Sequence, residues 1–277
     1  MTISPPPRPD PDIVARLRAA GCVFAEDEAR LLTAAARTPA DLTAMVDRRA
    51  GGLPLEQVLG WAEFCGLRIT VAPGVFVPRR RTEFLARRAI ALARGAAGPG
   101  VPVIVDLCCG SGAVGAALAA ALGPVELHAA DIDPAAVRCA RANLAAAGGH
   151  VYQGDLYDPL PAALRGRVHV LVANAPYVPS AEVGLLPAEA RIHEPRAALD
   201  GGADGLAVLR RVAAAAPQWL APGGHLLVEA SQWQTSLAAV AVARAGLATQ
   251  VATSAEFGTG VVTGTQPAGP TCGPRWR

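Results

Sequence analysis

The fold is decided by Val101-Pro-Val-Ile-Val-Asp-Leu107, an apolar run that leads directly into Cys108-Cys-Gly-Ser-Gly112. The β-branched residues of the run favour a buried strand. The glycines that follow permit a tight turn, and an Ala- and Leu-rich helix then extends to about Leu122. A strand, a glycine turn and a helix in this order are typical of α/β domains that bind a ligand at the turn.

Outward from this stretch, strand and helix patterns alternate toward the carboxyl terminus. Apolar runs predict further strands at Glu126–Ala130, Val168–Ala173 and His225–Glu229. Helical patterns lie between them, notably at Pro134–Ala147 and Gly205–Ala216. Strands separated by helices form parallel sheets that are covered on both faces. We therefore expect an α/β fold with a doubly wound, mostly parallel sheet.

The first hundred residues have a different pattern. Short helical patterns occupy about 12–20, 25–37 and 40–50, and Gly51-Gly52 ends them. An extended region follows from Trp61 to Val77, and a helix is expected from about Thr82 to Arg94. The Gly- and Ala-rich segment 95–100 predicts a boundary between two domains.

Composition excludes several chemistries. All 25 basic residues are Arg, so the chain has no Walker A lysine, no Schiff-base or pyridoxal-phosphate lysine and no Tyr-Lys hydride-transfer pair. The net charge of +2 is too small to predict electrostatic binding of nucleic acid. The amino terminus lacks the apolar core of a secretory signal. The uncharged stretch Leu107–Val125 is broken by glycines, so we expect it to be buried rather than to span a membrane.

The cysteines predict a reducing compartment. The six lie at Cys22, Cys65, Cys108, Cys109, Cys139 and Cys272. They form no CxxC pair and have no metal-ligand spacing with the five His residues. We therefore expect reduced thiols, a cytoplasmic protein, no disulfide framework and no metal site.

A candidate cofactor site follows the first strands of the sheet. Gly110, Gly112 and Gly115 form a GxGxxG pattern, although glycines that only pack a helix against a strand would give the same letters. Asp131 ends the second strand, where a carboxylate can accept hydrogen bonds from both ribose hydroxyls of an adenosine. Asp155-Leu156 follows a further strand that we expect between Pro134–Ala147 and Asp155, at a position where an adenine would lie. These features fit an adenosine cofactor, either NAD or S-adenosylmethionine (AdoMet).

The candidate catalytic segment is Asn174-Ala-Pro-Tyr177, at the end of the strand Val168–Ala173. A planar NH₂ group has two donors in its plane. The side-chain oxygen of Asn174 and the backbone carbonyl of Ala175 could accept one each, and Tyr177 could pack against the flat group. This arrangement would aim a weakly nucleophilic sp² nitrogen at the methyl group of a sulfonium ion. Simple loop punctuation remains the structural alternative for this segment.

On these residues the chain resembles the HemK/PrmC family, the release-factor glutamine methyltransferases. The matching stretches are Gly52–Gly60, Glu63–Leu67, Pro73–Arg79 with Thr82-Glu83, the glycine loop, Asp131–Pro134, Ala140–Asn143, Asn174–Tyr177, His193–Pro195, Ala198-Leu199 and Gly201–Gly205. The resemblance implies a Rossmann-like AdoMet-dependent methyltransferase domain, a small helical substrate-recognition domain before it and a linking β-hairpin. The expected divisions are a loose tail 1–11, the helical domain 12–60, the hairpin and linker helix 61–100, the methyltransferase domain 101–266 and a tail 267–277.

The resemblance also implies site residues and a partner. Together with the residue-level argument it predicts a cofactor site of Cys108, Cys109, Gly110, Ser111, Gly112, Asp131, Asp155, Leu156 and Asn174. The predicted catalytic residues are Asn174, Ala175, Pro176 and Tyr177. The implied acceptor is the glutamine of a Gly-Gly-Gln loop on a peptide-chain release factor, or a glutamine of another translation protein, and neither nucleic acid nor a membrane is an expected partner. His193-Glu194-Pro195 has no chemical role that we can assign.

The chain departs from the family pattern at several positions. Ala175 replaces the first proline of Asn-Pro-Pro-Tyr, and Cys108-Cys109 replaces a common Gly-Thr pair. Leu156 stands where an aromatic residue often contacts adenine, and Arg79-Arg80-Arg81 replaces a sequence like Pro-Arg-Pro-Glu. The segment Ser254–Gly264 lacks an expected Asp and Arg. A divergent acceptor specificity is therefore one interpretation.

Three other functions remain open from the sequence. A DNA or RNA amino-methyltransferase would use the same acceptor geometry on adenine, although the charge and the helical amino-terminal region disfavour it. An NAD-dependent oxidoreductase would use the GxGxxG pattern, although the lack of lysine and the Asn174–Tyr177 segment disfavour it. A module that binds AdoMet without turnover is the non-enzymatic alternative.

Overall fold

A seven-stranded sheet forms the centre of the molecule. The computed structural model describes residues 9–96 and 100–268. The strands of the sheet are β3 (Val103–Leu107), β4 (Glu126–Asp131), β5 (His150–Gln153), β6 (Val168–Ala173), β7 (Leu220–Ser231), β8 (Ala248–Ser254) and β9 (Thr259–Thr265). They are ordered β5-β4-β3-β6-β7-β9-β8, and the first five of these run parallel. β9 runs antiparallel to both of its neighbours, β7 and β8. The expected α/β fold with a mostly parallel sheet is confirmed.

The strand order creates a crevice at the carboxyl edge of the sheet. The chain runs from β3 outward to β4 and β5 and then returns to place β6 on the other side of β3. Connections therefore leave β3 in opposite directions. In open α/β sheets this switch point leaves room for a ligand just beyond the strand ends. Segments that follow β3, β4 and β6 meet at this crevice.

One strand is longer than expected. The sequence predicted His225–Glu229, because Pro222-Gly223-Gly224 normally interrupts a strand. The structure begins β7 at Leu220 and accommodates these residues where the register with β6 shifts between Val168 and Val170. The prediction of the start was therefore wrong, because an irregularity in the pairing absorbs the proline and the glycines.

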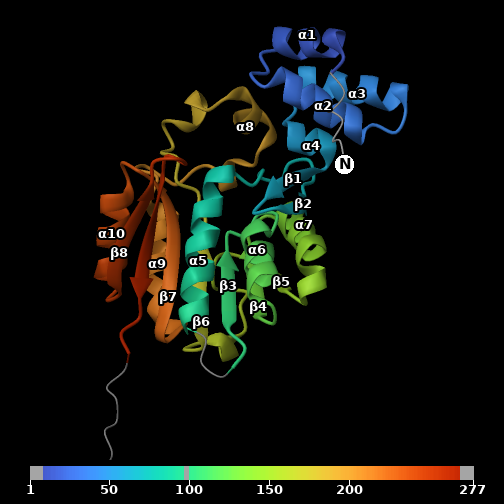
Figure 1. The fold of residues 1–277 in the computed structure, drawn as a ribbon. Coiled ribbons are helices and arrows are strands. Elements are labelled where there is room, and N and C mark those ends of the chain that lie inside the picture. The colour runs from blue at the N-terminus through green and yellow to red at the C-terminus, as the bar shows by residue number, and fades with distance from the viewer. Residues whose placement is uncertain (1–8, 97–99, 269–277) are drawn as a thin grey trace, which may run out of the picture.

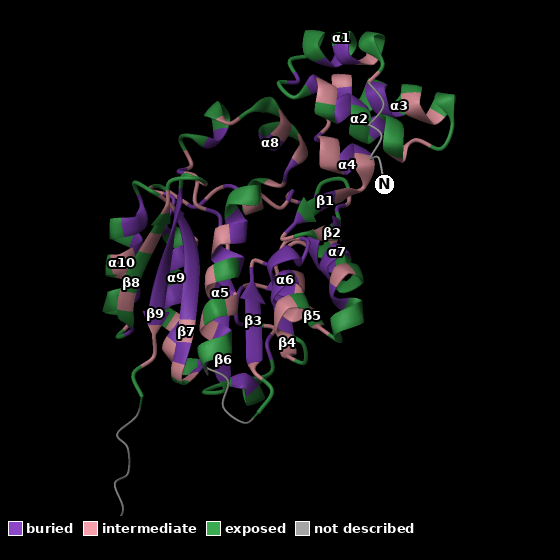
Figure 2. Ribbon diagram, in the orientation of Figure 1, coloured by how far each residue is buried: buried purple, intermediate pink, exposed green. Residues whose placement is uncertain are grey.

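Helices cover both faces of the sheet (Figure 1). One face carries α5 (Glu83–Ala96), α6 (Ala113–Leu122) and α7 (Pro134–Leu144), and the other carries α9 (Ala207–Ala215) and α10 (Thr235–Arg244). Because side chains alternate along a strand, Val105 and Leu107 face α9 and α10 while Ile104 faces α5 and α6. Figure 2 shows the strands buried between these two layers.

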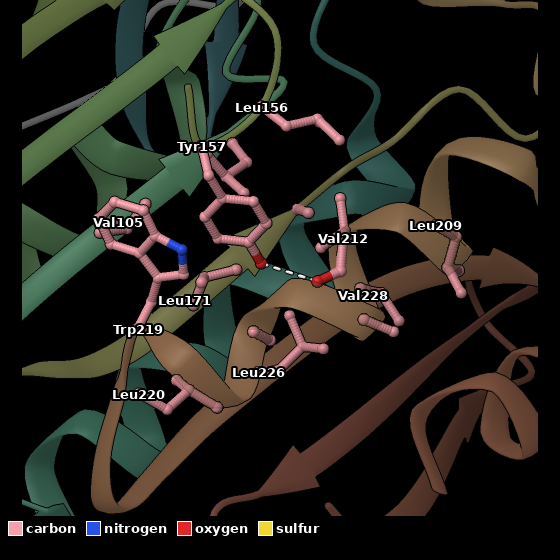
Figure 3. Packing of buried hydrophobic residues seen from close by; sticks show 14 of the residues in the cluster. Val105, Leu156, Tyr157, Leu171, Leu209, Val212, Trp219, Leu220, Leu226 and Val228 are labelled. Atoms are coloured by element: carbon pink, nitrogen blue, oxygen red, sulfur yellow. Dashed lines mark hydrogen bonds between the residues drawn. The ribbon is translucent and has the colours of Figure 1, made fainter. Parts of the chain in front are cut away.

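The α9 layer is closed by an aromatic pair (Figure 3). The hydroxyl of Tyr157 donates to the carbonyl of Val212 over 2.8 Å, and the Tyr157 ring stacks on Trp219 with centroids 5.4 Å apart. The preceding residue, Leu156, has a positive φ of 49°. This left-handed conformation turns the chain so that Tyr157 enters the core while Leu156 lines the crevice.

The amino-terminal helices pack around a core of their own. They are α1 (Pro11–Ala19), α2 (Ala25–Ala35), α3 (Pro39–Ala50) and α4 (Leu55–Leu59), and they bury Leu17, Leu32 and Met45. The three expected helices are confirmed to within about two residues at each end. Side chains cap two of them, since Asp10 accepts from the Asp12 amide and Thr38 from the Asp41 amide.

A hairpin and a short helix connect this bundle to the sheet. The strands β1 (Trp61–Phe64) and β2 (Leu67–Thr70) are joined by Cys65 and Gly66, whose φ values of 50° and 73° are the positive pair that a type I′ turn requires. The segment 181–199, called the α8 segment, carries α8 (Ala188–His193) and lies above the sheet beside the bundle in Figure 1. Buried Arg49 pairs with Glu28 of the bundle and with Glu189 of α8.

The remaining short elements are 3-10 turns. They are η1 (Arg80–Thr82), η2 (Ala145–Ala147), η3 (Ala162–Leu164), η4 (Val183–Leu185), η5 (Arg196–Ala198) and η6 (Ala216–Gln218). No helix within the described residues is long and apolar enough to cross a membrane. The uncharged stretch 107–125 is divided between β3, the glycine loop and α6. The expected tails lie mostly outside the described residues, which exclude 1–8 and 269–277.

Candidate active site

A cleft of about 520 Å³ opens at the carboxyl edge of β3, β4 and β6. This volume lies within the range of cofactor and small-molecule sites. All but one of the residues predicted for the cofactor and catalytic sites line this cleft, and the exception is Gly112. The lining residues are Cys108, Cys109, Gly110, Ser111, Asp131, Asp155, Leu156, Asn174, Ala175, Pro176 and Tyr177. Parts of the α8 segment, including Leu186, Pro187 and Ala190, form the opposite wall.

The glycine loop connects β3 to α6. Cys108, Gly110 and Gly112 all have positive φ, at 53°, 54° and 79°. At Gly112 a Cβ atom would approach the Ala140 backbone and the Leu144 side chain of α7 to 3.2 Å. Gly112 is therefore required by conformation and by helix packing, and it lies behind the cleft wall rather than in it. Helix packing therefore explains Gly112, whereas its neighbours Gly110 and Ser111 line the cleft.

Two carboxylates hold the loop in place. Asp106, at the end of β3, accepts from the Gly115 amide over 2.9 Å, and Asp131 accepts from the Gly110 amide over 2.8 Å. The second oxygen of Asp131 accepts from the Asp133 amide. Burial raises the pKa of Asp106 to about 7, and burial also raises the pKa of Asp131. Asp131 thus lies at the end of β4, where the sequence predicted it, with an orientation set by the loop.

Asp133 lines the cleft and also caps the helix that follows it. Its Oδ1 accepts from the Ala135 amide over 2.7 Å, and Pro134 is the first residue of α7. This is the helix-capping arrangement that the Asp-Pro pair predicts.

Asp155 and Leu156 form the far side wall of the cleft. The Asp155 carboxylate pairs with Arg211 of α9 over 2.6 Å, and both residues line the cleft. Leu156 is nearly buried and offers an apolar surface there. An adenine could lie against Leu156, with no aromatic ring from this position to stack on it.

The thiols of Cys108 and Cys109 do not close the cleft. Burial raises the pKa of both thiols well above the ordinary range, so both are neutral near pH 7. The cysteines at 22, 65, 108, 109 and 139 are unpaired. No group of three His, Cys, Asp or Glu residues in the described part of the chain could hold a metal ion.

The Asn174–Tyr177 turn presents two oxygen acceptors. The Asn174 Nδ2 donates to the Thr82 hydroxyl over 3.3 Å. Within residues 9–96 and 100–268, no protein donor lies within hydrogen-bond geometry of Asn174 Oδ1 or of the Ala175 carbonyl oxygen. Because both residues line the cleft, two acceptors remain available for a planar NH₂ group.

A glycine-rich loop supports this turn from behind. A Cβ at Gly201 would lie 2.6 Å from the Pro176 carbonyl oxygen, and a Cβ at Gly205 would overlap that of Tyr177. The side chain of Gln234, which is fully buried, donates to the Tyr177 carbonyl over 2.9 Å and to the Asp204 carbonyl over 3.1 Å. The sequence predicted no role for Gly201–Gly205 beyond the resemblance, and nothing in it indicated Gln234.

The Arg cluster and the His193-Glu194-Pro195 segment are linked. Glu194 is buried, and it accepts from the Val77 amide over 3.1 Å and from Arg79 over 2.5 Å. Arg79 also lies over the Phe76 ring, and Arg81 lies over the Tyr177 ring at 5.4 Å. Glu194 therefore fastens the α8 segment to the chain before α5, and Arg79 and Arg81 line the cleft rather than forming only a solvated basic face.

Two further residues lie beside the turn, and the sequence predicted no role in the site for either of them. Thr82, from η1, accepts from Asn174, and Glu229 lies at the carboxyl end of β7 beside it. Burial raises the pKa of Tyr177 to about 12, and the Glu229 carboxylate adds to this shift. The sequence contains one signal for Glu229: it is an acidic residue in the otherwise mostly apolar strand His225–Glu229, at a position that alternation places on the same face as Leu227.

Comparison with known proteins identifies relatives. A family model described as the Methyltransferase small domain matches residues 96–211. A release factor glutamine methyltransferase of Bradyrhizobium diazoefficiens is 36% identical over 80% of this chain and 81% of its own length. One from Geobacter sulfurreducens is 40% identical over 67% of this chain and 63% of its own.

A third relative has a different printed activity. It is a 4-amino-L-phenylalanine/4-methylamino-L-phenylalanine methyltransferase of Streptomyces pristinaespiralis, 38% identical over 68% of this chain and 65% of its own length. The chain thus covers slightly less than two thirds of the Geobacter and Streptomyces proteins. A methyltransferase structure from Pyrococcus furiosus matches 82% of this chain and 99% of its own at a TM-score of 0.55 and 14% identity, which shows the fold alone.

Proposed function

The chain belongs to the family of release factor glutamine methyltransferases, and from this premise we propose that it transfers a methyl group from AdoMet to the side-chain nitrogen of a protein glutamine. The proposed acceptor is the glutamine of the Gly-Gly-Gln loop of a peptide-chain release factor. The observation that carries the proposal is the pair of free acceptor oxygens, Asn174 Oδ1 and the Ala175 carbonyl, at the wall of the cleft.

AdoMet is the proposed cofactor, and the cleft fits it. Asp131 offers the remaining lone pairs of its carboxylate to the ribose hydroxyls, and Leu156 offers an apolar surface to the adenine. The Asp131 carboxylate also makes this end of the cleft suitable for a cation such as the sulfonium. Cys108, Cys109, Gly110 and Ser111 form the backbone wall there. AdoMet supplies the electrophilic methyl group.

The protein's contribution to the reaction is positioning. The two in-plane hydrogens of the acceptor amide donate to Asn174 Oδ1 and to the Ala175 carbonyl, which directs the nitrogen along the cleft. Accepting these hydrogen bonds increases electron density on a nitrogen that is otherwise delocalised. The nitrogen then forms a bond to the methyl carbon as the carbon–sulfur bond breaks and the electron pair stays on sulfur. The surplus proton on the methylated amide is acidic and leaves to water.

Ala175 is compatible with this reaction. The acceptor at this position is a backbone oxygen, so the change from proline leaves it in place and removes only one fixed φ angle. Ala175 is buried at 3% exposure, and the close approach of Gly201 and Gly205 to the turn limits its movement.

The proposed partner is a protein of translation, and the proposed location is the cytoplasm, where such proteins act. The α1–α4 bundle is proposed as the surface that recognises the protein substrate. It is joined to the cleft through Arg49, which bridges Glu28 and Glu189.

A second candidate acceptor is favoured by one observation, the 38% identical amino-acid methyltransferase from Streptomyces. An aromatic amine is also a planar, conjugated NH₂ group, so the same pair of oxygens could orient it. A small amino acid would need no recognition by the helical bundle. The two candidates therefore differ in whether the bundle contributes to substrate affinity.

The test is transfer of labelled methyl groups to a panel of acceptors. The panel contains a release factor, the same factor with its loop Gln replaced, 4-amino-L-phenylalanine, and total DNA and RNA. We expect label on the release factor only, at the loop glutamine by mass spectrometry, and loss of transfer in Asn174→Ala with the fold retained by circular dichroism. Label on the amine would establish the second candidate, and label on nucleic acid or tight binding of NAD without AdoMet would refute both.

A further inference from the structure

A buried carboxylate, that of Glu229, lies beside the Asn174–Tyr177 turn with one ion-pair contact, to Arg81. The side chain of Glu229 is 1% exposed, and neither of its oxygens has a hydrogen-bond partner within the part of the chain that the structure describes. Its closest cation is Arg81, whose Nε lies 3.5 Å from Oε1. A buried charge is costly unless hydrogen bonds compensate it, so a carboxylate at this position calls for a role.

The sheet places Glu229 next to the catalytic turn. Ala173 of β6 pairs with Val228 of β7, so the next residues in each strand, Asn174 and Glu229, are neighbours. Both lie on the face of the sheet that α5 covers, and Thr82 precedes α5 there. The Thr82 hydroxyl accepts from Asn174 Nδ2, and the Thr82 and Thr259 hydroxyls and Arg81 lower the Glu229 pKa against the larger effect of burial.

The orientation of the Asn174 carboxamide decides whether the site works. A carboxamide is nearly symmetric in shape, and a rotation of its plane by half a turn exchanges the acceptor oxygen for the NH₂ donors. With its NH₂ toward the cleft, Asn174 would place donor against donor and could not accept a hydrogen bond from the NH₂ group of the methyl-accepting glutamine. The neighbouring hydrogen bonds must therefore specify one orientation.

We propose that Glu229, acting through Thr82, is a positioning residue that keeps the Asn174 carboxamide oriented with Oδ1 toward the cleft. The inference rests on the proposed methyl transfer. Arg81 beside Glu229 favours the ionised carboxylate, which can only accept hydrogen bonds and would therefore attract the hydroxyl hydrogen of Thr82. The Thr82 oxygen then presents its lone pairs to Asn174, and it can receive Nδ2 but not Oδ1. Glu229 thus sets the direction of the hydrogen bonds from Thr82 to Asn174, although it does not touch the substrate.

The test compares variants by steady-state kinetics and AdoMet calorimetry. Thr82→Val removes the hydroxyl at nearly constant volume, Thr82→Ser restores it, and Glu229→Gln removes the charge. The matched control is Thr263→Val, a threonine of β9 that is buried to the same degree, 4% against 3% exposed. Thr263 pairs with Leu227 rather than Glu229, and it is not a lining residue of the cleft.

The expected result is a loss confined to the chemical step. Thr82→Val and Glu229→Gln should lower kcat about 10-fold to 100-fold, as expected when aligned hydrogen bonds to a reacting group are lost. Thr82→Ser should retain most of kcat, and all variants should bind AdoMet within about twofold of wild type. Equal kcat in Thr82→Val and Thr263→Val, or a parallel loss of AdoMet affinity, would overturn the inference.

A second measurement needs no turnover and separates this inference from the proposed function. The Asn174 carboxamide gives a pair of side-chain signals in a ¹H–¹⁵N spectrum, identified by their loss in Asn174→Ala. Glu229→Gln and Thr82→Val should shift these signals, and Thr263→Val should leave them unchanged. Unchanged signals in Glu229→Gln would refute the inference, whereas an inactive wild type with the expected shifts would refute only the proposed function.

Discussion

Substitution of Gly205 by alanine should damage the catalytic turn while leaving the cofactor end of the cleft intact. Gly205 has a φ of 76°, a conformation that costs an L side chain about 1–2 kcal/mol. Its Cβ would overlap the Tyr177 carbonyl oxygen and approach Gln234 Nε2, the donor to that oxygen. Overpacking of this kind costs about 1–3 kcal/mol, and a lost hydrogen bond about 1 kcal/mol more.

The expected total is therefore about 4 kcal/mol of lost unfolding free energy in Gly205→Ala. The matched control is Gly246→Ala, which follows α10, has a similar φ of 85° and meets no atom within 4 Å. The control should lose only the conformational part, about 1–2 kcal/mol. Urea unfolding followed by circular dichroism measures both free energies, and the difference isolates the steric overlap.

Activity provides the second half of this prediction. A displacement of about 1 Å in the turn can reduce turnover about 100-fold, so Gly205→Ala should lose that much kcat while its AdoMet affinity stays within about twofold. Gly246→Ala should retain full kcat. If the two variants unfold at the same urea concentration and turn over equally, the loop does not support the turn and the reasoning from close approach is wrong.

The other predictions concern the cleft itself. Asp131→Ala should weaken AdoMet binding about 10-fold to 100-fold by calorimetry, because charge-assisted hydrogen bonds to the ribose are lost, and an unchanged dissociation constant would show that the ribose lies elsewhere. The raised pKa of Asp106, about 7 against 3.8, means that the folded protein binds this proton more tightly than the unfolded chain. The unfolding free energy of the wild-type protein, relative to that of Asp106→Asn, should therefore fall by up to about 4 kcal/mol as pH rises from 4 to 7. The same difference in unfolding free energy between the two proteins at both pH values would contradict this assignment. Ala175→Pro should keep at least half of wild-type kcat, because the acceptor is the backbone oxygen, and a collapse of activity would mean that this turn differs from that of the family.

Local sequence patterns predicted β3, β4, β6, β7 and most helices, because burial and periodicity are visible in the sequence, but they predicted neither β8 nor β9. β3 and β6 are continuous apolar runs, and Thr38 and Asp133 mark helix starts by their capping side chains. The start of β7 was missed because the proline and glycines there contradict strand propensity. Ala248–Ser254 was not predicted as a strand, since β8 is an edge strand of small and polar residues with few buried positions.

The candidate site also contains residues that the sequence predicts and residues that it does not. The residues that form its two main loops lie in short motifs that follow predicted strands, so their positions could be inferred from the sequence. The supporting residues come from other parts of the chain: Thr82 and Gln234 directly precede α5 and α10, and Glu229 lies near the end of β7. They meet the Asn174 turn only through the register of β6 with β7 and the packing of α5 and α10. One-dimensional patterns contain no signal for such contacts.

The most direct test is a crystal structure with S-adenosylhomocysteine and a Gly-Gly-Gln peptide bound together. We predict that the glutamine side-chain nitrogen will lie about 2.7–3.2 Å from both Asn174 Oδ1 and the Ala175 carbonyl oxygen, with the cofactor sulfur in line beyond it. A glutamine amide bound away from these two oxygens, or an Asn174 carboxamide with its NH₂ toward the peptide, would contradict the account.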